Sequence, residues 1–262
     1  MTGMRLKISM LAAATLLAVN AAHAADLVPL PPPPQPCCDN WYLRGYAGVG
    51  LNGNYTLDYL QNPANSSDFA FDYQSIADTP FVGGAVGYNW NNWLRFDVSA
   101  EYRAKTRVYA FGHYTTGGWA LDTYEGNLDS WVFLANAFVD LGTWNCFTPF
   151  IGAGVGGAYV TLADFSDINP SLAGFGVGRN PSEWNLAYAF YAGVSYEVTK
   201  SLQVDLTYRY LNYGSITDTV DCFGGCNPDS FKFDNLYSND IMLGLRWTCC
   251  DVAPPPPLET RG

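Results

Sequence analysis

The chain has 262 residues, of which 14% are charged and 16% are aromatic, and its formal net charge is −11. In soluble domains about a quarter of the residues are charged, so this composition is unusual for one, and the acidic balance disfavours nucleic acid as a partner. After the N-terminal segment there is no apolar run of about 18 residues, which excludes a transmembrane helix there.

Residues 1–24 have the pattern of a cleaved secretory signal peptide. Arg5 and Lys7 form a basic start, residues 8–19 form an apolar run, and residues 22–24 read AHA, a small-x-small cleavage site. The run is too short to cross a membrane as a helix. Its removal leaves 24 acidic and 11 basic residues, a net charge of −13, on an exported chain.

Period-two alternation of apolar and polar side chains predicts eight strands of about ten residues. The clearest case is LRFDVSAEYRAK at 94–105, where twelve residues alternate without a slip. In chain order the strands are predicted at 41–51, 81–90, 94–105, 129–141, 149–160, 186–198, 202–211 and 237–247.

The predicted connections alternate in length. Three are short, at 91–92, 142–148 and 199–201. The other four exceed twenty residues and lie at 52–80, 106–128, 161–185 and 212–236. Short turns on one side, long loops on the other and an even number of strands are typical of an outer-membrane barrel. In a compact soluble domain, four structureless loops of this length would be unusual.

The two faces of the strands indicate which side meets lipid. A soluble, lipocalin-like barrel would bury the apolar face, and alternation alone does not exclude that arrangement. The polar face is rich in glycine, which a narrow eight-stranded lumen needs if it is to hold long charged side chains. Aromatic residues also gather at the ends of the apolar face, as interfacial girdles do: Trp41, Tyr88, Trp90, Tyr102, Trp131, Tyr159, Tyr196, Tyr208, Tyr210 and Trp247. The sequence therefore favours a membrane barrel.

Four stretches resemble one known family in their order and spacing. WYLRGYAGVG, TPFIGAGVGGAYV, SLQVDLTYRYLNYG and DIMLGLRW are similar to segments of the small Gram-negative outer-membrane β-barrel proteins, the opacity-type or porin-family surface antigens. The resemblance covers roughly 41–247. It implies an all-β fold, an eight-stranded antiparallel up-and-down transmembrane barrel with short periplasmic turns and long extracellular loops. Such chains usually end at an aromatic residue, whereas here Trp247 is followed by TCCDVAPPPPLETRG.

The resemblance also implies a place in the cell and a role. We expect a signal peptide at 1–24, a proline-rich periplasmic arm at 25–40, an outer-membrane barrel at 41–247 and a proline-rich tail at 248–262. The expected role is structural, in envelope integrity, with antigen-like surface interaction. Expected partners are outer-membrane lipid and lipopolysaccharide, with peptidoglycan-side or host-surface contact. A narrow porin-like channel for ions or small solutes is the alternative, and an outer-membrane lipid-modifying enzyme is a minor one.

Twelve charged residues, six of each sign, fall on the face that would line the lumen. Unpaired charges in a low-dielectric interior are costly, so this pattern predicts a paired network that fills the barrel. A narrow ion path is the functional alternative. The residues are Arg44, Arg95, Asp97, Glu101, Arg103, Lys105, Asp140, Glu197, Asp205, Arg209, Asp240 and Arg246.

Signals for catalysis and cofactor binding are weak. Residues 48–53 and 152–157 both satisfy G-x-G-x-x-G, but they lie in predicted strands, whereas a dinucleotide site needs a helix to begin at the motif. His113 is the single histidine after the signal, and no nucleophile or orienting group is fixed beside it. The sequence predicts no catalytic residue, no cofactor and no enzyme.

The long connections are acidic. DFSDIN at 164–169 lacks the EF-hand pattern, so no metal site is predicted. Two interpretations are left open. The loops are solvated and self-repelling, or they bind divalent ions weakly or bridge to lipopolysaccharide through such ions. The acidic residues are Asp58, Asp68, Asp72, Asp78, Asp164 and Asp167.

Seven cysteines in an exported chain predict disulfides and one thiol left over. Cys222 and Cys226 flank FGG and would bridge a surface hairpin, while Cys146 lies in a short turn. The first strand must pair with the last to close the barrel, which places the two vicinal pairs side by side. We predict one or two disulfides between them. Adjacent cysteines fit a four-cysteine metal site poorly; the pairs are Cys37, Cys38, Cys249 and Cys250.

Overall fold

A computed structural model describes residues 40–53, 55–60, 69–115, 121–170, 174–223 and 229–248. Within these ranges the chain is built of strands, and no helix there is long and apolar enough to cross a bilayer. The strands are β1 (Trp41–Asn52), β2 (Thr56–Tyr59), β3 (Phe69–Ile76), β4 (Thr79–Asn89), β5 (Leu94–Tyr114), β6 (Leu121–Asp140), β7 (Phe147–Asn169), β8 (Gly174–Gly178), β9 (Ser182–Glu197), β10 (Leu202–Phe223) and β11 (Asp229–Thr248).

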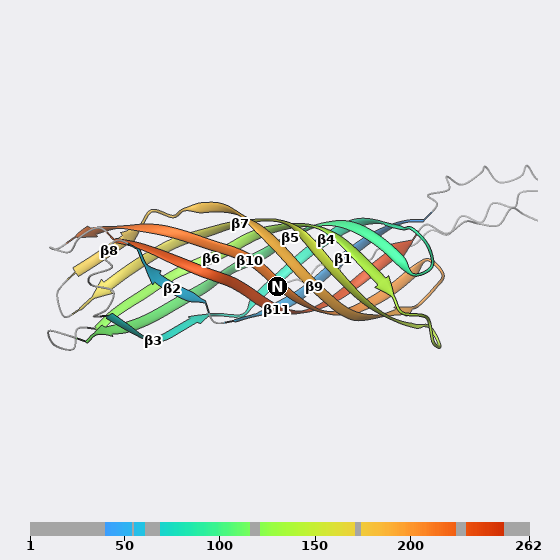
Figure 1. Ribbon diagram of the computed structural model, residues 1–262, viewed down its shortest axis with the longest axis horizontal. Helices are drawn as coiled ribbons and strands as arrows, with labels where there is room; N and C mark the ends of the chain where they lie inside the picture. Colours follow the sequence, from blue (N-terminus) through green and yellow to red (C-terminus); the bar gives the residue numbers. More distant parts are fainter. Residues whose placement is uncertain are drawn as a thin grey trace, which may run out of the picture. The chain divides into compact units, whose positions relative to one another are not determined.

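Eight strands close into an antiparallel ring (Figure 1). Each pairs with the next in the order β1, β4, β5, β6, β7, β9, β10 and β11. The seam joins β11 back to β1 over eleven residue pairs, from Tyr42 opposite Thr248 to Asn52 opposite Ser238. This pairing confirms the predicted eight-stranded barrel, and closure removes the free edges that an open sheet would expose.

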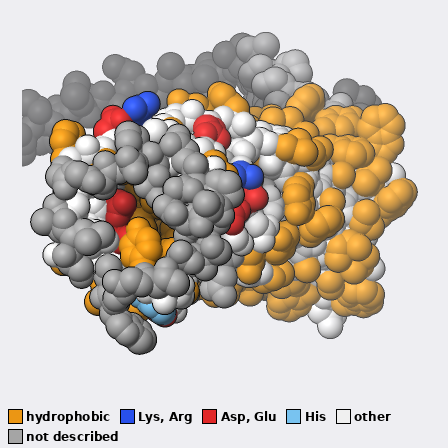
Figure 2. All heavy atoms as spheres, turned by 60° about the vertical axis from the view of Figure 1, so that its left-hand side comes forward, with side chains coloured by type: hydrophobic (Ala, Val, Ile, Leu, Met, Phe, Trp, Pro, Cys, Tyr) orange, Lys and Arg blue, Asp and Glu red, His pale blue; other side chains and the backbone are white. Residues whose placement is uncertain are grey.

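The membrane part of the barrel has its apolar side chains on the outside. Leu43, Val86, Val98, Val155 and Leu243 point outward and are between 51% and 65% exposed. Figure 2 shows such side chains gathered over one part of the barrel wall. Exposed tryptophans lie at both ends of this apolar band, as interfacial girdles do. We call the end with the short turns the inner end and the opposite end the outer end. Trp41, Trp90 and Trp247 lie at the inner end of the band, and Trp131 and Trp184 lie at its outer end.

The strands are longer than predicted, and the prediction of four structureless connections above twenty residues is wrong. β5, β6, β7, β10 and β11 have 20 to 23 residues, about twice the 9–11 that a bilayer requires. Their outer halves therefore continue beyond the apolar band. There β8 takes the place of β9 between β7 and β10, while β2 and β3 pair with β11 and β5.

β-Bulges hid these outer halves from a period-two pattern. In β5 the register shifts between Arg103 and Thr106, so the inward positions change from odd to even numbers and Val108 is buried. β7 and β10 contain similar shifts. An extra residue in one strand moves every later side chain to the opposite face. A pattern read continuously from the membrane half therefore assigns the outer half to a loop.

The interior of the outer half is apolar. Phe165, Phe231 and Phe233 are fully buried, and their rings meet at centroid distances of 5.4 and 5.7 Å. Tyr124 packs on Phe231 at 5.1 Å. This part of the barrel has the apolar interior of a soluble barrel, whereas the membrane part has the inverse arrangement.

We expect Val98→Arg to destabilise the barrel by about 2–4 kcal/mol, because this outward side chain lies midway along the apolar band of β5 and a charge there meets hydrocarbon. Urea titration of the protein in lipid vesicles measures the loss. Val177→Arg is the matched control, since Val177 is also exposed but lies in the outer half. Equal stability of the two variants would contradict the assignment of the band.

Candidate functional site

Four charged residues form a closed cluster at the centre of the lumen. Arg209 donates from Nη1 and Nη2 to the two carboxylate oxygens of Glu101 at 2.9 and 2.7 Å. Arg103 donates to the two oxygens of Asp240, both at 3.0 Å. Arg209 Nε also donates to Asp240 Oδ2 at 2.7 Å, and Arg103 Nη1 to Glu101 Oε1 at 3.2 Å. All four side chains are buried, and each charge has two neighbours of opposite sign in this low-dielectric interior.

A second group surrounds Asp97. Arg44 Nη2 donates to Asp97 Oδ2 at 2.8 Å, and the Tyr42 hydroxyl donates to the same oxygen at 3.0 Å. Asn136 Nδ2 donates to Asp97 Oδ1 at 2.7 Å. The Tyr191 hydroxyl then donates to Asn136 Oδ1 at 2.9 Å. The carboxylate is thus satisfied by one ion pair and two neutral donors, as a buried charge requires.

A third group lies nearer the inner end and is less completely paired. Arg95 Nε donates to Asp140 Oδ1 at 3.2 Å. Arg246 Nη2 donates to Ser195 Oγ at 2.9 Å and to Asp205 Oδ1 at 3.3 Å. Within the residues that the structure describes, several buried atoms of this group have no hydrogen-bond partner: Arg95 Nη1 and Nη2, Arg246 Nε, and Asp205 Oδ2.

Aromatic rings fill the space between the guanidinium groups. The Arg95 guanidinium carbon lies 4.4 Å from the centre of the Phe138 ring and 4.6 Å from that of Phe150. Arg103 and Arg209 each lie 5.0 Å from the ring of Phe81. Cations over aromatic faces gain energy without a hydrogen-bond partner. These contacts, with the ion pairs, occupy the cross-section of the membrane part.

The two glycine motifs make room for this network. A Cβ atom added at Gly50 would collide with the Arg103 guanidinium, and one added at Gly154 would collide with the Asn136 side chain. Both glycines lie within strands, β1 and β7. The motifs therefore serve close packing in the lumen, and no helix N-terminus follows either within the described residues.

Two of the twelve predicted lumen charges are not in the lumen. Lys105 follows the β5 bulge, so its side chain faces outward, is half-exposed and pairs with Asp164 at 2.7 Å. Glu197 is the last residue of β9 and is exposed at the inner mouth, because the strand ends there. The remaining ten form the paired network predicted from the sequence, with five arginines and five carboxylates.

Parity on the strands could have found further members of the site. Tyr42, Phe81, Asn136, Phe138 and Phe150 all have inward parity on their strands and are buried. The aromatic ones are apolar side chains on an otherwise polar face, so polarity alone does not identify them as lumen residues. Their positions in the sequence alone would have placed them in the lumen.

The acidic residues predicted in loops are spread over the outer half. His113 lies in β5 and not in a loop. Its Nδ1 lies 2.7 Å from Asp72 Oδ2, and this contact joins β3 to β5. Asp58 lies in β2 opposite Lys232. Asp68 is outside the described residues. In the part of the chain that the structure describes, no three His, Cys, Asp or Glu side chains are grouped to hold a metal ion.

An exposed ion pair lies at the outer end. Arg179 donates from Nε to both carboxylate oxygens of Asp221, at 3.2 and 3.0 Å. The hydrogen bond from Arg179 lowers the pKa of the Asp221 carboxyl below its usual range. Burial raises the pKa of the nearby Asp218 carboxyl. At neutral pH the outer end therefore carries a fixed pair of opposite charges on its surface.

Most of the cysteine predictions concern residues that the structure does not describe. Cys146 is an exposed free thiol in the turn between β6 and β7, where Asn145 and Cys146 have φ of 47° and 69°. Cys222 lies near the end of β10. The Cys222–Cys226 bridge and the disulfides across the seam stay predictions, since their other members lie outside the described residues: Cys37, Cys38, Cys226, Cys249 and Cys250.

Comparison with known proteins agrees with this geometry. The model of the family described as "Outer membrane protein beta-barrel domain" matches residues 11–248. The chain belongs to this family. It is therefore an outer-membrane protein, and its apolar band faces lipid.

Relatives of the chain match over most of their length. An uncharacterized protein of Brucella abortus is 32% identical over 267 residues, which cover 88% of this chain and 94% of that protein. Outer membrane protein PagN of Salmonella typhimurium is 26% identical over 233 residues, with 79% and 88% covered. A Rickettsia conorii protein that carries an adhesin name is 32% identical over 218 residues, with 80% and 82% covered.

We expect Arg209→Ala to cost about 3–5 kcal/mol of stability, because it leaves the buried carboxylates of Glu101 and Asp240 short of a counter-charge. Urea unfolding in lipid vesicles measures it. Lys105→Ala is the control. It removes a cation of the barrel strand β5 whose ion pair with Asp164 is exposed, and this variant should unfold as the unchanged protein does. A loss in Lys105→Ala as large as in Arg209→Ala would refute the central role of the buried cluster.

Proposed function

We propose that the protein is a structural barrel of the outer membrane that also presents a contact surface outside the cell. The observation that carries this proposal is the outer half of the barrel. Its strands are continuous with the membrane part and its interior is packed with buried aromatic rings. It is thus a rigid support that extends beyond the lipid-facing band.

An apolar row crosses the surface of that outer half. Ile168 in β7 pairs with Phe175 in β8, which pairs with Phe223 in β10. The three side chains are 40%, 45% and 60% exposed. Exposed apolar clusters with a polar rim are typical of interaction sites, and the Arg179–Asp221 ion pair lies beside this one. The row therefore supports contact with another surface, including that of a host cell.

The names of two relatives agree with this role. PagN is an outer membrane protein, and the Rickettsia relative is named as an adhesin. For the apolar band itself we propose outer-membrane lipid and lipopolysaccharide as the partners. We also propose that residues 1–24 are cleaved after export and that the segments 25–40 and 248–262 are periplasmic arms.

The alternatives receive less support from the lumen and the outer half. A porin-like channel needs a water path, whereas ion pairs and the rings of Phe81, Phe138 and Phe150 occupy the membrane part. An enzyme needs a nucleophile and a base in contact, and His113 contacts the carboxylate of Asp72. We therefore propose neither transport nor catalysis as the main role.

Replacing Phe175 and Phe223 by serine should weaken attachment of cells carrying the protein to host-cell layers, by about tenfold in apparent affinity if the two rings act as buried anchors. Counts of attached cells measure the effect. Leu121→Ser is the matched control, since Leu121 is exposed on the same half but outside the row. Unchanged attachment by the double variant would remove the proposed contact surface.

In planar lipid bilayers the purified protein should give no reproducible single-channel step, because the lumen is filled. Bilayers treated with detergent alone give the background. A reproducible step of constant size would contradict the filled lumen and favour the channel alternative.

A further inference from the structure

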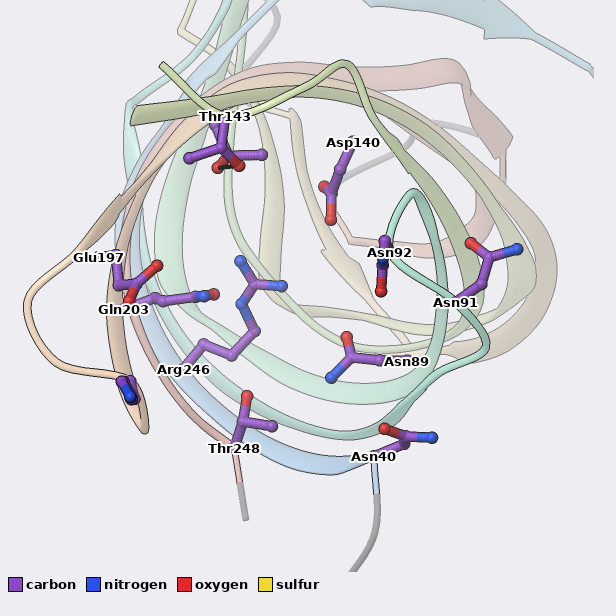
Figure 3. Close-up of a pocket in the computed structure, with 12 residues that line it drawn as sticks. Asn40, Asn89, Asn91, Asn92, Asp140, Thr143, Glu197, Gln203, Arg246 and Thr248 are labelled. Carbon is purple, nitrogen blue, oxygen red and sulfur yellow. Dashed lines mark hydrogen bonds between the residues drawn. The ribbon is translucent and has the colours of Figure 1, made fainter. Parts of the chain in front are cut away.

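A polar cavity of about 360 Å³ opens at the inner end of the barrel. Its size lies within the range of ligand pockets, about 300–1,000 Å³. Its walls come from the ends of β4, β6, β9, β10 and β11 and from the short turns between strands (Figure 3). The inner end faces the periplasm, on the opposite side of the membrane from the proposed contact surface. The inference therefore does not rest on the proposed function.

Buried side chains lie next to the cavity, on the side of the barrel interior. Tyr42, Phe138 and Phe150 are 2% exposed or less, and the Arg95 guanidinium lies against the rings of both Phe138 and Phe150. Arg246 lies over the Tyr42 ring at 5.6 Å. A solute that enters from the periplasm would have to displace this packed layer to go further, so the cavity has the character of a cup and not of a channel entrance.

Arg246 supplies a cation inside the cup. Its side chain is 4% exposed, and Figure 3 shows the guanidinium in the middle of the ring of lining residues. The hydrogen bonds to Ser195 and Asp205 both leave from Nη2, and in the described part of the chain no group accepts a hydrogen bond from the buried Nε. A buried guanidinium with an unused donor is a site for an acceptor, and a carboxylate is the acceptor that forms the strongest bond with it.

Carboxylates lie elsewhere on the wall of the same cup. Asp140 projects into it from the end of β6, and the bond from Arg95 uses its Oδ1. Glu197 is exposed at the rim. Both attract a cationic group. The amides of Asn89, Asn92 and Gln203 also line the cup, and they both donate and accept hydrogen bonds as a peptide group does.

We propose that this cup binds a zwitterionic amino acid or short peptide. The carboxylate of the ligand pairs with Arg246, its ammonium group pairs with Asp140 and Glu197, and the rim amides bind its peptide group. Such a ligand reaches the cup either as a free peptide in the periplasm or as a peptide stem of the cell wall.

The test uses the full-length protein in detergent micelles and isothermal titration with alanyl-alanine. Its C-terminal amide and its N-acetyl form each remove one charge, and each should bind more weakly by about tenfold or more, because a charged hydrogen bond is lost. Equal binding of the three compounds, or no binding of alanyl-alanine, would overturn the proposal.

Two variants separate binding from folding. Gln203→Trp fills the cup from β10 without touching an ion pair and should abolish binding. Leu202→Trp places the same ring on the neighbouring outward position and should bind as the unchanged protein does. Heat-dependent migration in gels verifies that both variants are folded. Retained binding in folded Gln203→Trp would place the ligand elsewhere and overturn the proposal.

A second arm identifies the source of the peptide. The protein is mixed with purified cell-wall sacculi and centrifuged. Sedimentation that alanyl-alanine competes away supports a cell-wall peptide as the ligand, whereas titratable binding without sedimentation supports a free peptide.

Discussion

The pairing of five arginines with five carboxylates inside a narrow barrel is the constraint on which the rest of the structure depends. An eight-stranded ring leaves an interior that side chains just fill. The outward side chains of its wall are apolar and contact lipid. The interior must therefore be polar without access to bulk water, and this is stable only if each charge is paired. Glu101, Arg103, Arg209 and Asp240 satisfy this condition from three different strands: β5 supplies two of them, β10 one and β11 one. Their pairing thus requires the correct ring of strands.

The same strands serve two solvents, and the bulges mark the change between them. Below the bulge in β5 the inward positions are Glu101 and Arg103, and above it they are Val108 and Ala110. Lipid surrounds the first part, so its outer face is apolar and its interior is charged. Water surrounds the second part, so the apolar residues move inside. A change of parity of one residue makes this inversion possible within a single continuous strand.

The sequence predicted the barrel well because the membrane part obeys one strict rule. Alternation at 94–105 has no interruption, and the other membrane segments follow the same rule, so strand number, closure and the ten lumen charges could be deduced. The outer halves could not, because their faces have weaker contrast: Tyr109 and Phe111 point outward while Val108 and Ala110 point inward. The bulge positions themselves have no composition that identifies them. Lys105 was misplaced for this reason alone, since it is the first residue whose direction depends on the bulge.

A packed lumen also determines where this protein can act. The cross-section is occupied at three levels: by the apolar core around Phe165 in the outer half, by the Glu101 cluster at the centre, and by Arg95 with the adjacent rings of Phe138 and Phe150 near the inner end. A ligand that passed through these layers would have to separate buried ion pairs, which is costly. We therefore expect contacts with other molecules at the lipid-facing wall and at the two ends. Because a closed and densely packed barrel resists small deformations, a ligand at one end has little means of altering the other. The proposed contact surface and the proposed cup should therefore act as independent sites, which one barrel holds on opposite sides of the membrane.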